Sequence, residues 1–116
     1  MMKVLKLIFF TLTLLALSFI SCKKENVDSL DCSTIHARYT TDIAPILNTH
    51  CLSSGCHNAG STYGDLTNYT NVKMVVNDGS FESKVIKDKS MPPSQTLSTD
   101  ELNKIKCWIS SGYPNN

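Results

Sequence analysis

Two cysteines and a histidine lie close together near the middle of the chain and carry its most reactive side chains. Cys51 and Cys56 are separated by four residues, and His57 follows the second cysteine directly. Thiols are nucleophiles that bond to carbon, metal or a second sulfur, and an imidazole binds transition metals through a ring nitrogen. The intervening Leu-Ser-Ser-Gly ends in residues that favour a turn, so both thiols could reach the same side of this loop.

This spacing is compatible with three kinds of chemistry. Two cysteines followed directly by histidine form the attachment pattern of c-type haem, in which the thiols bond the vinyl groups and the imidazole binds the iron. That pattern usually has two residues between the cysteines, so the longer loop must bulge outward for Cys51 to reach the ring. The alternatives are a Cys51–Cys56 disulfide beside an exposed His57, or a zinc site that also uses His50.

A haem that transfers electrons needs a second iron ligand, commonly methionine or histidine. Met91 is the candidate, because it follows His57 by 34 residues and two prolines after it restrict the backbone that presents its thioether. The alternative is a loop methionine that fills a gap in the packing. Met74 lies in an apolar segment and is expected in the core, while His36 and His50 are rival ligands that rank below Met91.

The N-terminal segment has the features of an export signal. Two lysines precede an apolar run over 7–20, which is shorter than the roughly 20 residues that span a bilayer. We expect a signal peptide over 1–21, a lipidated N-terminus and tether over 22–38, and one domain over 39–116. The alternative is an ordinary signal cleaved elsewhere, with Cys22 incidental.

Charge and motifs exclude several functions. Without Lys3 and Lys6, the 11 basic residues become 9 against 10 acidic ones, a formal charge of −1. This near-neutral balance gives no reason to expect nucleic-acid binding. Paired carboxylates, a nucleophile elbow and a phosphate-binding glycine loop are all missing from the sequence, so hydrolase or transferase chemistry has no support.

The periodicity of apolar residues predicts an all-α domain. A first helix is expected over 39–51, where Ile43, Ile46 and Leu47 share one face. Pro45 is compatible with this helix if Thr41 or Asp42 is the cap, since the proline then lies in the first turn.

Three further segments follow the Cys-His motif. Turn-forming residues over 58–65 predict a loop, and short helical stretches are expected over 69–76 and 81–86. The last helix has the clearest start, because Ser98 and Glu101 form a capping box. Leu97 and Leu102 are spaced to form a hydrophobic staple at this start. The apolar stripe of the helix comprises Leu102, Ile105, Trp108 and Ile109.

Cys32 and Cys107 are left after the other cysteines are assigned. Cys107 lies roughly opposite the apolar stripe of the last helix, where a buried core thiol is not expected. A Cys32–Cys107 disulfide would join the tether to that helix, and closing a loop of about 75 residues would contribute on the order of 4 kcal/mol. The alternative is two free thiols.

The order of these features resembles the cytochrome c superfamily. The resemblance lies in a helix, Cys-x4-Cys-His, a loop, Met-Pro-Pro and a helix reading Leu-Ser-x-x-Glu-Leu-x-x-Ile-x-x-Trp-Ile-x-x-Gly, and it covers 39–116. The segment Phe-Ile-Ser-Cys ending at Cys22 is similar to a bacterial lipobox, and the whole chain looks like single-haem lipoproteins of Bacteroidota. The resemblance implies a small cytochrome c-like fold of three to five helices around one covalently attached haem.

The same resemblance implies the roles of individual residues. Cys51 and Cys56 would attach haem c, and His57 and Met91 would be the axial iron ligands. With both axial positions filled, the iron has no open position for a substrate, so we expect an electron carrier and not an enzyme. Its partners would be redox proteins and, through a lipid on Cys22, a membrane of the cell envelope, and we expect a monomer. Alternatives are a non-redox surface lipoprotein and a haem sensor or peroxidase-like enzyme from which Met91 dissociates.

Overall fold

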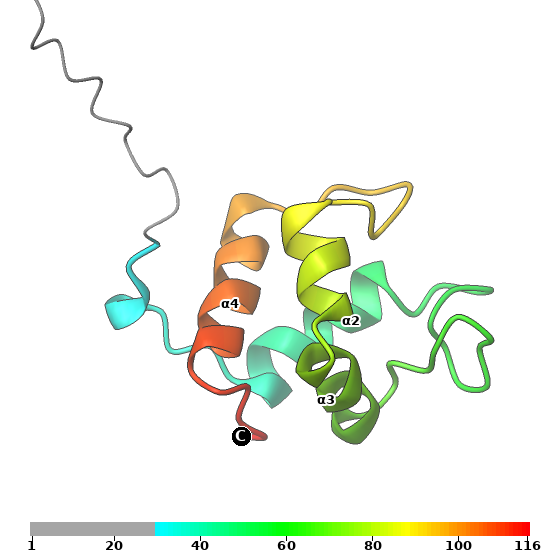
Figure 1. Ribbon diagram of the computed structural model, residues 1–116, viewed down its shortest axis with the longest axis horizontal. Helices are drawn as coiled ribbons and strands as arrows, with labels where there is room; N and C mark the ends of the chain where they lie inside the picture. Colours follow the sequence, from blue (N-terminus) through cyan, green and yellow to red (C-terminus); the bar gives the residue numbers. More distant parts are fainter. Residues whose placement is uncertain (1–29) are drawn as a thin grey trace, which may run out of the picture.

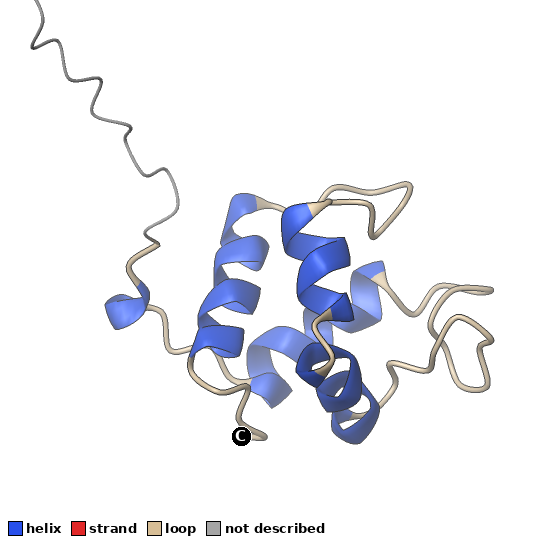
Figure 2. Ribbon diagram, viewed as in Figure 1, coloured by secondary structure: helices blue, strands red, loops and turns tan. Residues whose placement is uncertain are grey.

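The computed structural model describes residues 30–116, in which all regular structure is helical (Figure 2). This confirms the expected all-α class. The expected signal peptide over 1–21, the lipid site at Cys22 and the tether over 22–29 lie outside the described residues. None of the helices in the described part is long and apolar enough to cross a membrane.

Four helical segments enclose the core, and a short 3₁₀ turn precedes them (Figure 1). The first is a π-helical turn, η3, that continues directly into α2, and η4 is also π-helical. Their bounds are η2 Cys32–Thr34, η3 Tyr39–Ile43, α2 Ala44–His50, α3 Tyr69–Asn77, η4 Glu82–Lys87 and α4 Thr99–Ser110. The expected helices over 39–51, 69–76 and 81–86 therefore exist, with bounds shifted by at most one residue.

The first helix begins differently from the sequence prediction. Neither Thr41 nor Asp42 is its cap, because the helix already begins at Tyr39 and its N-cap is Arg38. Asp42 instead accepts a hydrogen bond from the backbone N–H of Arg38 at 3.0 Å. The π-helical pairing ends just before Pro45, which lies in the first turn of α2. Because proline lacks an N–H, this position has no backbone donor that could be left unpaired.

The core lies between η3, α2, α3, η4 and α4. Tyr39 is central to it, because its ring lies 5.1 Å from the ring of Tyr69 and 5.9 Å from that of Trp108, measured between centroids. The indole N–H of Trp108 is also satisfied, since it donates to the carbonyl of Pro114 at 3.0 Å. The fully buried side chains are Ile43, Leu47, Val72, Ile105 and Trp108.

Met74 is not a core residue, so that prediction was wrong. Its side chain is 59% exposed, whereas Val72 and Val76 on the same helix are buried. Residues four apart share a face of an α-helix, and the residue midway between them lies on the opposite face. Met74 therefore faces away from the core although the surrounding sequence is apolar.

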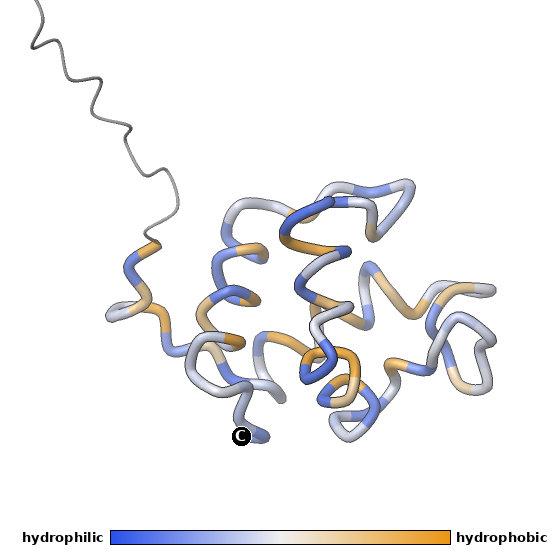
Figure 3. Tube along the Cα trace, in the orientation of Figure 1, coloured by the Kyte–Doolittle hydropathy of each residue, from blue (hydrophilic) through white to orange (hydrophobic). Residues whose placement is uncertain are grey.

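The last helix forms as its sequence signals predict. Ser98 and Glu101 make the reciprocal capping box at the N-terminus of α4. Ile105 and Trp108 are fully buried, and Leu102 and Ile109 pack partly against the core. Figure 3 shows this pattern as apolar and polar stretches that alternate along α4.

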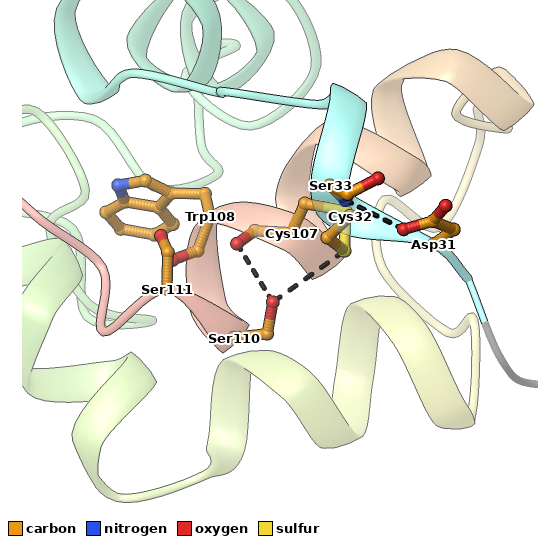
Figure 4. The surroundings of a disulfide bond; sticks show 7 residues. All are labelled: Asp31, Cys32, Ser33, Cys107, Trp108, Ser110 and Ser111. Atoms are coloured by element: carbon orange, nitrogen blue, oxygen red, sulfur yellow. Dashed lines mark hydrogen bonds between the residues drawn. A yellow bond between two sulfur atoms is a disulfide. The ribbon is translucent and has the colours of Figure 1, made fainter.

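A disulfide joins Cys32 to Cys107, with their Cα atoms 5.4 Å apart (Figure 4). It ties η2 to the last turns of α4. Ser110 lies beside it and donates to the carbonyl of Cys107 at 3.0 Å. Cys107 lies away from the main apolar stripe but is only 2% exposed, a burial that its position on the helix did not predict. The bonded segment accounts for this, because η2 lies against this side of α4.

The C-terminal residue closes the start of η3. The carbonyl of Asn116 accepts from the backbone N–H of Thr40 at 2.9 Å, and its side-chain oxygen accepts from the backbone N–H of Tyr39 at 3.1 Å. These are among the first N–H groups of a helix, which have no partner inside the helix itself. Asn116 therefore supplies the cap that the first helix lacks in its own sequence.

Candidate functional site

One cavity collects the predicted haem-binding residues. It has a volume of about 240 Å³ and lies where the end of α2 meets the loop over 51–66 and the loop that follows η4. Cys51, Cys56, His57 and Met91 all line it, although Met91 comes from a distant part of the sequence. The other lining residues are His50, Gly55, Tyr63, Pro92 and Pro93.

Backbone hydrogen bonds bring the two ends of the Cys51–His57 loop together. Cys51 caps the C-terminus of α2, where its N–H donates to the carbonyl of Leu47 at 2.8 Å. The N–H of His57 then donates back to the carbonyl of Cys51 at 3.0 Å, and that of Cys56 donates to Ser53 at 2.9 Å. Because the loop closes on itself, both cysteines line the same cavity, while Ser53, Ser54 and Gly55 between them are exposed.

Both cysteines of the cavity are free thiols. Burial raises the pKa of Cys51 to about 11, and the nearby Cys56 adds a smaller contribution in the same direction. Cys51 is therefore a neutral thiol at physiological pH. The thiol of Cys56 accepts a hydrogen bond from the hydroxyl of Ser53, with 3.1 Å between oxygen and sulfur.

A backbone carbonyl orients the imidazole of His57. The Nδ1 atom lies 2.9 Å from the carbonyl oxygen of Gly64, which only accepts hydrogen bonds, so Nδ1 carries the proton. The neutral ring then has its lone pair on Nε2. Gly64 has a backbone φ of +97°, a conformation that favours glycine. Two residues later, the N–H of Leu66 donates to the backbone carbonyl of His57 at 2.9 Å. The loop after His57 thus folds back and fixes the ring.

Met91 enters the cavity from the opposite segment of the chain. Its backbone N–H donates to the carbonyl of Lys84 in η4 at 3.2 Å, and the N–H of Ser90 shares this acceptor at 2.9 Å. The side chain is 39% exposed, which is unusual for a residue that only fills a packing gap. Met91 therefore lines the cavity while part of its surface is exposed.

The two rival histidines are placed differently. His36 is exposed and lies near the Cys32–Cys107 disulfide, at a separate cavity. His50 lines the same cavity as His57, but both of its ring nitrogens are hydrogen bonded, Nδ1 to Gln95 at 2.8 Å and Nε2 to Glu101 at 2.9 Å. His50 therefore has no ring nitrogen available for a metal in this arrangement.

Sequence reasoning missed four residues of the site. Tyr63 lines the cavity and is 76% exposed, and Gly64 supports His57. Both lie in the loop over 58–65, which the sequence predicted to pass over one edge of the haem without assigning a role to either residue. Gln95 and Glu101 were missed as partners of His50, because no spacing rule connects polar residues so far apart in sequence.

Within residues 30–116, no three His, Cys, Asp or Glu side chains are grouped to hold a metal ion. A haem iron held by one imidazole and one thioether requires no such group.

The chemistry of the lining residues fits haem c. Two thiols are available to bond vinyl groups, and an imidazole nitrogen and a thioether sulfur are both iron ligands. Two prolines and a tyrosine add apolar surface to the wall. The volume lies below the range of about 300–1,000 Å³ typical of ligand pockets, so part of a group as large as haem would remain in contact with solvent.

Comparisons with protein-family models, curated proteins and solved structures give no match for this chain.

Proposed function

We propose that this chain is a c-type cytochrome that transfers electrons through a single covalently attached haem. The observation that carries the proposal is that Cys51, Cys56, His57 and Met91 line one cavity. The first three are neighbours in sequence, but Met91 is not, and its presence there supplies a second iron ligand from an independent segment. When bound, the haem would take up and release one electron at its iron.

The chain's own residues have distinct tasks in this proposal. The thiols of Cys51 and Cys56 would hold the haem by each adding across a vinyl group, with sulfur on one carbon and hydrogen on the other, so no further reactant would be consumed. Gly64 holds the proton on Nδ1 of His57 and keeps Nε2 as the donor to iron. The thioether of Met91 is a soft ligand that favours the reduced iron and raises the potential.

We further propose that the protein is not an enzyme, because His57 and Met91 together would fill both axial positions. A lipid on Cys22 would hold it in the cell envelope, where oxidising conditions preserve the Cys32–Cys107 disulfide. Its partners would be redox proteins that approach the cavity, where Tyr63 and Met91 are exposed.

A haem stain after denaturing electrophoresis tests this function. The full chain is produced together with cytochrome maturation machinery, and the proposal expects haem to migrate with the polypeptide. The double variant Cys51→Ser, Cys56→Ser should abolish the stain, whereas the matched double variant Cys32→Ser, Cys107→Ser should retain it, because those sulfurs lie outside the cavity. A colourless band from correctly matured wild-type protein would refute the proposal and favour a non-redox lipoprotein with a Cys51–Cys56 disulfide.

A further inference from the structure

His50 connects three parts of the molecule at the edge of the cavity. It is the last residue of α2, directly before Cys51, and its side chain is only 15% exposed. Its Nδ1 lies 2.8 Å from Oε1 of Gln95, and its Nε2 lies 2.9 Å from Oε1 of Glu101. A histidine whose two nitrogens both bind distant residues fixes the relative positions of the segments that carry them.

Glu101 is itself held in place by the cap of α4. Its Oε2 accepts from the backbone N–H and from the hydroxyl of Ser98, both at 2.8 Å. The second carboxylate oxygen is thereby left for His50. Because the capping box anchors Glu101 to a well-defined helix start, this partner of His50 is a rigid support.

Gln95 belongs to the loop that carries Met91. This loop is fixed at its start, where Lys84 accepts from two backbone N–H groups, and at its end, where Leu97 is buried. The side chains over 93–96 are exposed. Among the hydrogen bonds of the described chain, the one between Gln95 and His50 joins the loop over 92–97 to the segment that holds Cys51, Cys56 and His57.

We propose that His50 is a positioning residue that holds the Met91 loop in place over the cavity. It would act through Gln95 and would not bind the iron itself. This inference rests on the proposed function, because it assigns a role in keeping Met91 opposite His57. It also explains why a histidine next to the attachment site lines the cavity without offering a free nitrogen.

The hydrogen-bonding capacities of the three side chains suit this task. A carboxylate only accepts, so Nε2 of His50 carries a proton toward Glu101. The amide of Gln95 presents either its oxygen or, after rotation, its NH₂ group, so it bonds Nδ1 whether or not that nitrogen is protonated. The connection therefore holds in both charge states of the imidazole.

The first experiment measures iron ligation in the matured full chain. His50→Leu should lose the methionine-to-iron charge-transfer band, because the loop no longer holds Met91 in position, while His50→Gln should restore at least part of it. His36→Leu is the matched control, since His36 is exposed and distant from the cavity. A charge-transfer band and midpoint potential in His50→Leu equal to those of His36→Leu would overturn the inference.

A second readout does not depend on haem. In full chain made without maturation machinery, amide hydrogen exchange should become faster at Ser90 and Met91 in His50→Leu, because their N–H groups hold the start of the loop to Lys84, with exchange in α3 unchanged. A rise of exchange in α3 as well would mean that His50→Leu loosens the whole fold. The variant Gln95→Ala then provides the test, because it removes only the exposed partner of His50 in the loop. Unchanged exchange of the loop amides in Gln95→Ala would refute the positioning role of His50, even if the protein binds haem. Faster exchange of these amides would support that role, even if the haem stain failed.

Discussion

The Nδ1 atom of His57 lies 2.9 Å from the carbonyl oxygen of Gly64, and no other hydrogen bond of the described residues reaches this imidazole. The contact selects one tautomer of the ring and leaves Nε2 available. Gly64 reaches this position only because its backbone adopts a positive φ. A single glycine in a turn-rich loop thus decides which ring nitrogen of His57 carries the proton.

Substituting Gly64 should alter both stability and redox potential. Gly64→Ala is expected to cost about 1–2 kcal/mol in unfolding free energy, because a side chain is strained at this φ. Under the proposed function, a weaker hydrogen bond would make His57 a poorer donor to oxidised iron, so the midpoint potential should rise. Urea unfolding and a redox titration measure the two effects. Gly60→Ala is the control, since Gly60 also has a positive φ but does not contact His57. If both variants shift the potential equally, the hydrogen bond has no special role.

Met74 and Met91, the two exposed methionines within residues 30–116, should respond differently to substitution. Met91→Ala is expected to lose the methionine-to-iron charge-transfer band and to lower the midpoint potential, because a soft axial ligand is removed. Met74→Ala should change neither quantity, since Met74 lies on the outer face of α3. Absorption spectra of the matured variants give the answer. An unaltered spectrum of Met91→Ala would assign the second axial position to a different residue.

Removing the disulfide should destabilise the fold without affecting haem attachment. The double variant Cys32→Ser, Cys107→Ser is expected to lose about 4 kcal/mol of unfolding free energy, because the bond closes a loop with a sequence separation of 75. Chemical denaturation of wild-type and variant protein under identical conditions measures the difference. A loss below about 1 kcal/mol would mean that the bond contributes little to the stability of the native domain.

The capping box offers a local test of the last helix. Ser98→Ala should cost about 1 kcal/mol, since it removes the hydroxyl that accepts from the backbone N–H of Glu101. Ser94→Ala is the matched control, because Ser94 is exposed in the preceding loop. Urea midpoints of the two variants should differ accordingly, and equal midpoints would contradict the stabilising role of the cap.

The His50–Glu101 pair should make stability depend on pH. Hydrogen bonding to Gln95 and Glu101 raises the pKa of His50 above 6.5, so its contribution is complete below 6.5 and is lost as pH rises through the folded pKa. Hydrogen bonds from Ser98, with a smaller effect of His50, lower the pKa of Glu101 below 4.5, so its contribution is complete above 4.5 and is lost as pH falls through the folded pKa. The Tm difference between wild type and His50→Gln should therefore be largest between pH 4.5 and 6.5. A difference independent of pH would exclude an ionic contribution of the pair.

Local sequence signals predicted the helices but not all of their details. The capping box predicted the start of α4, and the helix expected over 69–76 lies within one residue of the observed bounds of α3. The π-helical turn before Pro45 was not predictable from the sequence. A backbone N–H that bonds to the carbonyl four residues back and one that bonds five residues back bury nearly the same apolar face of the helix. The error at Met74 arose because an apolar neighbourhood was taken as burial, although in this segment Val72 and Val76 are buried, Val75 is partly buried and Met74 is exposed.

The candidate site was predictable where chemistry marks a residue by type and spacing. The Cys-His motif and the Met91 segment, which two prolines follow, were both singled out in the sequence, and both line the cavity. The supporting contacts were not predictable, because Gly64 acts through its backbone and Gln95 through an ordinary amide. Their roles depend on loop paths, which no local pattern in this sequence specifies.

The disulfide also determines how a mechanical load would enter the domain. Figure 1 shows η2 and the loop over 51–66 at opposite sides of the fold. A force applied to the chain before residue 30 would pass through the sulfur bridge into the last turns of α4, because Cys32 is bonded to Cys107 there. Such a pull would therefore reach α4 directly through the disulfide, without first passing along η3 and α2.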